Sequence, residues 1–168
     1  MKLRAAAAIL IVYSTLVIQR AMPDLPEQIP TSFNLQGRPT ATSRPETLWL
    51  LLAGQALIVA LLLAVPYIAR HAPQWINLGR KRLSDFSPKV QQQILLLLES
   101  ATGWMAVAFA LFFATMIRQL VGAAMDPSKI PGIWIIPVFF VGLLGILGFF
   151  AWKYLQLEKD PEPSSAPR

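Results

Sequence analysis

Four apolar stretches, separated by short polar connections, constrain this chain more than any other feature of its sequence. A membrane-crossing helix needs roughly 20 mostly apolar residues to span a hydrocarbon core of about 30 Å. The composition agrees, because only 14% of the residues are charged, against about a quarter in an average soluble domain. We therefore predict an all-α membrane protein, a single domain over 1–157 with four transmembrane helices. The predicted spans cover about 5–21, 47–69, 96–118 and 133–154.

The first apolar stretch has two interpretations. A basic start followed by an apolar run is also the pattern of a secretory signal peptide. The residues at its end, Ile18 to Met22, lack a small-x-small cleavage site. This favours an uncleaved helix, which Pro23 ends because proline cannot continue a helix. At the other end of the chain, the polar tail over 158–168 is rich in proline and is expected to be disordered.

Local patterns predict where the later helices begin and how one of them packs. Ser43 and Glu46 have the spacing of a capping box, which predicts the start of the second helix. Ser87 followed by Pro88 predicts the start of the third helix. The fourth stretch carries glycines at a spacing of three, for which we expect packing within the chain rather than a dimer face. These glycines are Gly142, Gly145 and Gly148.

The basic residues predict an orientation, because cytoplasmic connections carry an excess of Lys and Arg. With the N-terminus inside, ten of the fifteen Lys and Arg residues lie on the cytoplasmic side. We therefore predict that both termini are cytoplasmic. The proline-rich segment between the first two helices and the Asp126–Pro131 turn are then both extracytoplasmic, on the same side. The five basic residues expected outside are Arg20, Arg38, Arg44, Arg118 and Lys129.

Several classes of function are disfavoured by what the sequence lacks. The net charge of +6 is better explained by contacts with lipid headgroups than with nucleic acid, because no basic stripe is interleaved with aromatic residues outside the spans. The absence of cysteine excludes disulfides and thiolate chemistry. The single histidine, His71, has no acidic or sulfur companions for a metal site. We find no recognised catalytic motif and expect neither enzyme activity nor a metal or cofactor.

The segment from Leu25 to Gly37 is the most distinctive polar stretch. Pro26 and Pro30 prevent a helix and push the residues before them into extended geometry. The four residues that start at Asn34 and end at Gly37 fit a type I turn. Two interpretations stand: a lid that caps the helices, or a preorganised surface for a peptide or protein. The candidate surface residues are Pro26, Ile29, Pro30, Phe33, Asn34 and Gly37.

The pattern Leu-Pro-x-x-Ile-Pro-x-x-Phe-Asn-x-x-Gly in this segment resembles a bacterial membrane domain of unknown function. That domain also forms the N-terminal part of Sdp-type toxin-immunity membrane proteins. The resemblance implies a bacterial inner-membrane protein and, for the immunity branch, protection against a toxic peptide. The family usually has histidine where this chain has Ser32, and a small residue followed by lysine near Ser43 and Arg44. A metal or proton-sensing role at that histidine therefore does not transfer to this chain.

Two polar residues interrupt the apolar stretches. Gln55 lies about ten residues into the second helix, where an amide needs a partner, so we expect a helix–helix hydrogen bond, with substrate contact as the alternative. Glu99 lies near the start of the third span and has two interpretations, interfacial placement or a proton or cation role.

These observations predict a non-enzymatic, multi-pass protein of the bacterial inner membrane. In this interpretation the partners are the lipid bilayer and an extracytoplasmic peptide or membrane protein, which the chain senses or gives immunity to. The alternatives are a small transporter or transporter subunit, with Gln55 and Glu99 along its path, and a structural partner in a membrane complex.

Overall fold

Four long helices make up most of the computed structural model, which describes residues 2–34, 36–78, 81–126, 128–129, 132 and 134–159. The structure is 78% helical, and each long helix has the length and apolar composition to cross a membrane. The prediction of a mostly helical, multi-pass membrane protein is therefore confirmed. The tail over 160–168 lies outside the described residues. The helices are α1 (Lys2–Ala21), α2 (Thr47–His71), α3 (Pro88–Met125) and α4 (Ile135–Lys159).

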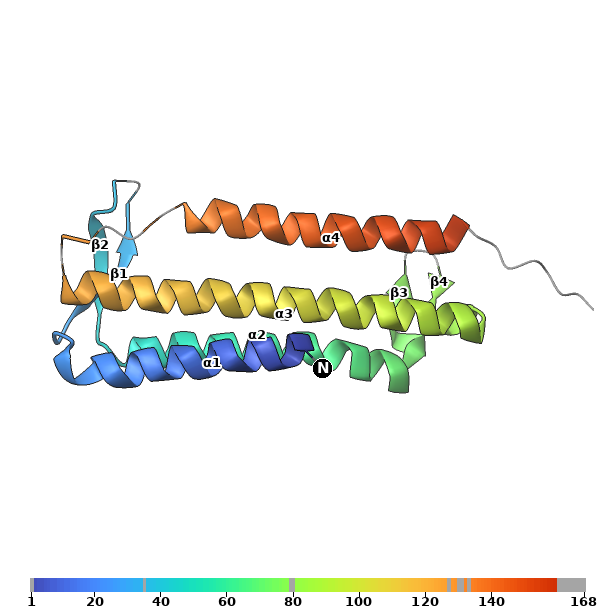
Figure 1. The fold of residues 1–168 in the computed structure, drawn as a ribbon, viewed down its shortest axis with the longest axis horizontal. Helices are drawn as coiled ribbons and strands as arrows, with labels where there is room; N and C mark the ends of the chain where they lie inside the picture. The colour runs from blue at the N-terminus through green and yellow to red at the C-terminus, as the bar shows by residue number, and fades with distance from the viewer. Residues whose placement is uncertain are drawn as a thin grey trace, which may run out of the picture.

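The helix α3 is the centre of the molecule, with α1 and α2 on one side and α4 on the other (Figure 1). The buried core forms three clusters along this bundle. Small residues line the middle cluster, which lets the helix backbones approach closely. The middle cluster contains Ala7, Val59, Ala106 and Ala110. The cluster nearest the end of α3 contains Ile18, Ala21, Ile29, Leu48, Ile117, Leu120 and Val121. The third contains Ala69, Leu83 and Ile94.

The helix α4 packs on α3 through aromatic rings. Phe139 stacks on Phe112 with ring centroids 4.3 Å apart and meets the edge of Phe109 at 5.0 Å. None of the apolar window of α4 is buried against the described chain. A Cβ built at Gly142, Gly145 or Gly148 meets no atom within 4 Å. The prediction that these glycines pack within the chain is therefore wrong, because Phe139 rather than the glycines provides the contact with α3.

A β-hairpin connects α1 to α2. Its strands β1 (Ile29–Phe33) and β2 (Pro39–Ser43) are antiparallel, with Ile29 opposite Ser43 and Phe33 opposite Pro39. The extended geometry predicted around Pro30 is confirmed for β1. The strand β2 was not predicted, because its residues carry no alternation of apolar and polar side chains that would mark a strand. Pro39 stands at the first position of β2, where a strand tolerates the missing donor.

The predicted capping box at the start of α2 is wrong. Ser43 belongs to β2, where its hydroxyl lies 3.3 Å from that of Thr31. Glu46 is the residue before α2 and makes no side-chain capping bond. The serine that the pattern assigned to the helix cap is instead part of the paired strand β2. The predicted start of α3 is confirmed, because Ser87 Oγ accepts from Val90 N and Pro88 is the first residue of the helix.

Short elements complete the connections. Between α2 and α3, two residue pairs form a second small sheet flanked by turns of 3₁₀ helix. A further 3₁₀ turn follows α1. These elements are η1 (Met22–Asp24), η2 (Pro73–Trp75), β3 (Asn77–Leu78), β4 (Lys81–Arg82) and η3 (Leu83–Asp85).

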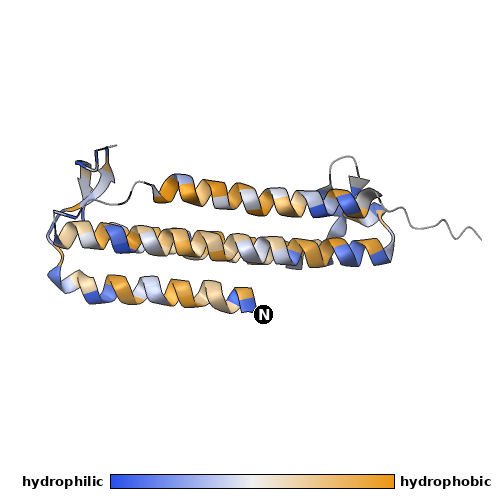
Figure 2. Cartoon of the chain, turned by 45° about the horizontal axis from the view of Figure 1, so that its top comes forward, coloured by the Kyte–Doolittle hydropathy of each residue, from blue (hydrophilic) through white to orange (hydrophobic). Residues whose placement is uncertain are grey.

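The non-helical segments gather at the two ends of the bundle. The hairpin lies at the same end as the turn after α3, as the sequence predicted (Figure 1). The last turn of α4 lies towards the other end, whereas the first turn of α1 lies part-way along α3 (Figure 1). Polar residues concentrate at both ends, and the length of the helices between them is mostly apolar (Figure 2). This arrangement keeps irregular backbone out of the apolar zone, where its polar groups could not bond to water.

Gly103 allows the first turn of α1 to pack on α3, and replacing it should weaken that contact. A Cβ at Gly103 would lie 2.9 Å from Leu3 Cδ1 and 3.3 Å from Leu3 Cβ, whereas one at Gly54 would meet nothing within 4 Å. Alanine in a helix is favoured over glycine by about 1 kcal/mol. We therefore expect Gly54→Ala to stabilise the protein in detergent. The free energy of unfolding of Gly103→Ala should be about 1 kcal/mol lower than that of Gly54→Ala, which is the low end of overpacking costs. Equal thermal unfolding midpoints would contradict the close approach.

Candidate functional site

The turn of the hairpin is held by Asn34 and Gly37. Gly37 N donates to Asn34 O at 2.9 Å, and Asn34 Oδ1 accepts from the backbone N of Gln36 at 3.0 Å and of Arg38 at 2.8 Å. Gly37 has a φ of 75°, which glycine adopts without strain. Leu35 lies outside the described residues, so the predicted type I geometry is not tested, although the hydrogen bond closes a four-residue turn. Both residues shape the hairpin.

The hairpin is fastened to the helices by apolar side chains. Ile29 is fully buried in the cluster formed by α1, α2 and α3, and Phe33 and Leu25 pack against the same cluster. Ile29 therefore anchors the hairpin and presents no surface to a partner. Of the other candidate surface residues, Pro26 is exposed and Pro30 is half-buried. Anchoring on Ile29 holds the rest of β1 in a fixed position above α3.

A cleft lies between this anchored hairpin and the facing ends of α3 and α4; we call it the hairpin cleft. Its volume is about 240 Å³. Phe33 and Ser32 reach it from β1, and Gln119 adds a half-buried amide from α3. Most of the remaining lining is apolar. The lining residues are Thr31, Ser32, Phe33, Met116, Gln119, Leu120, Gly132, Ile135 and Ile136.

An adjoining cavity of about 630 Å³ shares Gln119 and Gly132 with the hairpin cleft and adds two cations, Arg118 and Lys129. Lys129 lies 3.6 Å from Asp126. Hydrogen bonds from the hydroxyl and backbone N of Ser128 to Asp126 Oδ1, together with the charge of Lys129, hold the pKa of Asp126 below its ordinary value. Asp126 therefore stays ionised at neutral pH. Arg118 is exposed and has no ion pair among the described residues.

The structure brings together only part of the predicted surface. Phe33 and Ser32 both line the hairpin cleft. Pro26 lies at a separate shallow cavity beside the start of α2. Sequence reasoning missed the α3 and α4 walls, such as Met116 and Ile135, because they are apolar residues within apolar stretches. The one available signal was Gln119, a polar residue next to Arg118 near the end of α3.

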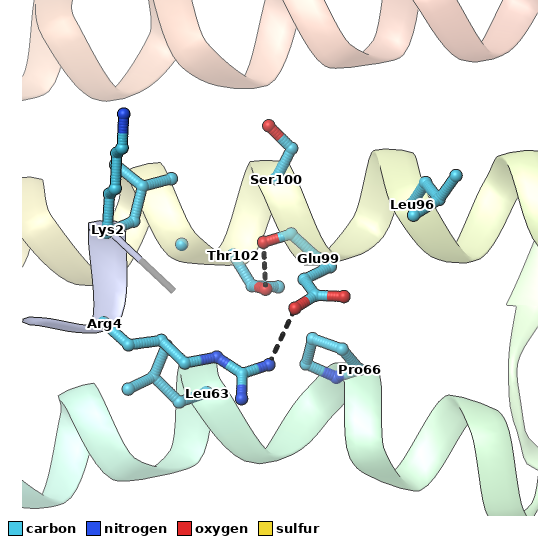
Figure 3. Close-up of a pocket in the computed structure, with 10 residues that line it drawn as sticks. Lys2, Arg4, Leu63, Pro66, Leu96, Glu99, Ser100 and Thr102 are labelled. Carbon is cyan, nitrogen blue, oxygen red and sulfur yellow. Dashed lines mark hydrogen bonds and ion pairs between the residues drawn. The ribbon is translucent and has the colours of Figure 1, made fainter.

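In the half of the bundle away from the hairpin, Glu99 of α3 binds two arginines. Its carboxylate accepts from Arg4 of α1 at 2.8 Å and from Arg70 of α2 at 2.5 Å (Figure 3 shows the Arg4 pair). The Glu99 side chain is 32% exposed. This arginine–glutamate cluster joins three helices, which sequence reasoning missed because the partners are 95 and 29 residues away. Arg4 and Arg70 lie near the ends of their helices, whereas Glu99 lies inside α3, and both interpretations of Glu99 remain predictions.

Gln55 lies inside the packed helices. It is fully buried, and its Nε2 donates to Ala110 O of α3 at 2.9 Å, which is the predicted helix–helix hydrogen bond. Its Oε1 is buried without a partner among the described residues. Gln55 is not among the residues that line the cavity beside Glu99. The two polar residues thus lie in different environments.

No group of three or more His, Asp or Glu side chains within the described ranges is placed to hold a metal ion. His71 contacts its own helix, with Nδ1 2.9 Å from Tyr67 O and the two rings 4.2 Å apart. Comparison of the chain with protein-family models, curated proteins and solved structures gives no match. What the fold itself defines is therefore the class: a multi-pass membrane protein with four candidate membrane-spanning helices in the part of the chain that the structure describes.

Replacing Gln55 separates its hydrogen bond from its packing. Leucine has a similar volume and removes both the hydrogen bond and the unpartnered Oε1, so we expect Gln55→Leu to change the free energy of unfolding by less than about 1 kcal/mol. Gln55→Ala leaves a cavity and should cost roughly 2 kcal/mol or more. Unfolding in mixed micelles measures both. A Leu variant as unstable as the Ala variant would show that the hydrogen bond, not packing, is what matters.

Proposed function

We propose that this chain is a non-enzymatic protein of a bacterial inner membrane that senses, or gives immunity to, an extracytoplasmic peptide. The observation that carries the proposal is the hairpin cleft, built between β1, α3 and α4. Binding sites are typically concave and mostly apolar, with a few polar groups that orient the ligand. Phe33 and Met116 provide the apolar lining, and Ser32 and Gln119 provide the polar groups. Such a site suits one apolar side chain of a peptide together with its neighbouring backbone.

The resemblance of the Leu25–Gly37 pattern to immunity-associated membrane domains supports the same function. The resembling segment is the one that supplies β1, and β1 supplies Ser32 and Phe33 to the cleft. In relatives the usual histidine would stand at the cleft itself. Here a neutral hydroxyl takes its place, so ligand binding at this position does not depend on a titrating side chain.

The cations beside the cleft suit an acidic group on the peptide. Arg118 has no ion pair among the described residues, whereas Lys129 is partly neutralised by Asp126. A guanidinium presents a planar pair of donors that matches a carboxylate. The peptide in this proposal therefore places an apolar side chain in the hairpin cleft and a carboxylate near Arg118.

The proposal places the hairpin on the extracytoplasmic side of the membrane and both termini in the cytoplasm. Its support is the distribution of Lys and Arg, because ten of the fifteen lie in the segments that would then face the cytoplasm. We expect a reporter enzyme that works only outside the cytoplasm to be active when inserted in the hairpin turn at Gln36. The same reporter should be inactive when fused after Arg168. The reverse pattern would reject an outward-facing cleft.

A bulky side chain in the cleft should abolish function without unfolding the hairpin. Ser32 is exposed and lines the cleft, so Ser32→Trp fills the space that a peptide side chain would occupy. Thr40→Trp is the matched control, because Thr40 is exposed on β2 and does not line the cleft. Cells that express the chain are challenged with the peptide fraction of medium conditioned by the host bacterium. We expect expression to raise survival, Ser32→Trp to remove the effect, and Thr40→Trp to retain it.

Membrane levels of the three proteins are compared in the same experiment. Equal protection by Ser32→Trp and Thr40→Trp at equal levels would show that the cleft is not the site. Survival that does not depend on expression of the chain would reject the immunity function itself.

A further inference from the structure

A groove with basic and apolar walls lies beside the arginine–glutamate cluster, part-way along α3 in the half of the bundle away from the hairpin; we call it the basic groove. Its volume is about 370 Å³. It forms where α2 and α3 extend beyond the first turn of α1 (Figure 1). All three helices contribute to its walls, among them Lys2 and Arg4 from α1, Leu63 and Pro66 from α2, and Leu96 and Ser100 from α3.

The groove carries an excess of positive charge. Lys2, Arg4 and Arg70 lie in or beside it, and Glu99 is the carboxylate that pairs with both arginines. Three cations against one carboxylate leave a net charge of +2. Both arginines bond to the one carboxylate of Glu99, so neither guanidinium has all of its donors satisfied by Glu99. An anion that enters the groove would therefore meet both charge and available donors.

Two further donors in the groove have no partner. Among the described residues, the Lys2 ammonium makes no ion pair. The Ser100 hydroxyl makes no hydrogen bond with them. Both side chains project from their helices towards α4, away from the Arg4–Glu99 pair (Figure 3). An ammonium and a hydroxyl that point the same way suit a group with several acceptor oxygens, such as a phosphate.

The remaining walls are apolar. Leu63 and Pro66 lie on the α2 side of the Arg4–Glu99 pair, and Leu96 lies farther along α3 (Figure 3). A free phosphate would gain nothing from these side chains. A lipid would gain from them, because a lipid is itself polar at its headgroup and apolar along its acyl chains. The groove lies at the corresponding boundary between polar and apolar side chains. Basic pockets between transmembrane helices bind anionic lipid headgroups.

We propose that the basic groove binds an anionic phospholipid. The lipid phosphate contacts Lys2 and Ser100, and the acyl chain lies on Leu63. Arg4 and Arg70 contribute positive charge while Glu99 holds them in place. Bound lipid thereby bridges α1 and α3, so it stabilises the packing of the first turn of α1.

The test uses the full chain in a neutral detergent, with phosphatidylglycerol or phosphatidylcholine added at equal mole fractions. We expect phosphatidylglycerol to raise the thermal unfolding midpoint and phosphatidylcholine to leave it unchanged. Lys2→Gln should weaken the apparent affinity for phosphatidylglycerol about fivefold, because one Lys or Arg near an anionic lipid is worth roughly that factor. Arg44→Gln is the control, since it removes the same charge from the hairpin end of the bundle.

Glu99→Gln gives a test with the opposite sign. Without lipid, this variant should be less stable than the parent, because the neutral amide lacks the carboxylate's charge and keeps only one oxygen to accept from Arg4 and Arg70. Its affinity for phosphatidylglycerol should nevertheless rise, because the competing carboxylate is gone. A groove with only a structural role would show the loss of stability without the gain in affinity.

Three results would overturn the proposal. The first is equal stabilisation by phosphatidylglycerol and phosphatidylcholine, and the second is unchanged phosphatidylglycerol affinity in Lys2→Gln. The third is a shift of the same size from inorganic phosphate alone, which would assign the groove to a free anion instead of a lipid.

Discussion

The packing of α1 and α2 against α3 is the interaction on which the rest of the structure depends. It is close because the residues between the helices are small: Ala7, Ala106 and Ala110 in the middle, and Gly103 beneath Leu3. Inside a bilayer, water exclusion does not drive helices together, so close van der Waals contact and polar bonds between helices take that role. The Gln55 amide and the Glu99 carboxylate supply such bonds from two levels of the bundle. The hairpin is then placed by Ile29, which enters the cluster at one end of the same three helices.

The helix α4 is held differently, and this gives the two candidate sites their shape. It packs on α3 through Phe139 and against the Ile94 cluster through Tyr154 and Leu157, while its glycines meet nothing in the described chain. A helix attached along one line leaves space on either side of that line. The hairpin cleft occupies such a space near Ile135. The basic groove arises in another way, from the unequal extent of α1 and its neighbours, so the two sites differ in origin as well as in chemistry.

Features governed by neighbouring residues could be predicted from the sequence, and features governed by distant pairs could not. The four apolar helices, the Ser87 start of α3 and the extended β1 follow from local composition and from proline geometry. The capping box at Ser43 failed because its serine pairs with Thr31 across a hairpin that the pattern did not reveal. A helix–helix hydrogen bond could be predicted for Gln55, but neither the partner helix α3 nor the acceptor Ala110 could. The two arginines on Glu99 were hidden for the same reason, since nothing in sequence spacing relates α1, α2 and α3.

The way the hairpin is built decides which substitutions can report on binding. Asn34 and Gly37 belong to the predicted surface, yet their hydrogen bonds and backbone geometry hold the turn, so replacing either would disturb the hairpin itself. Ile29 is the buried anchor, and its loss would detach β1 from the helices. Ser32 differs from all three, because its side chain is exposed and faces the cleft. Within the described chain, the pairing of β1 with β2 does not depend on a hydrogen bond from the Ser32 side chain. A loss of function on replacing Ser32 therefore reports on what binds in the cleft. The same loss on replacing Asn34, Gly37 or Ile29 would report on the fold of the hairpin.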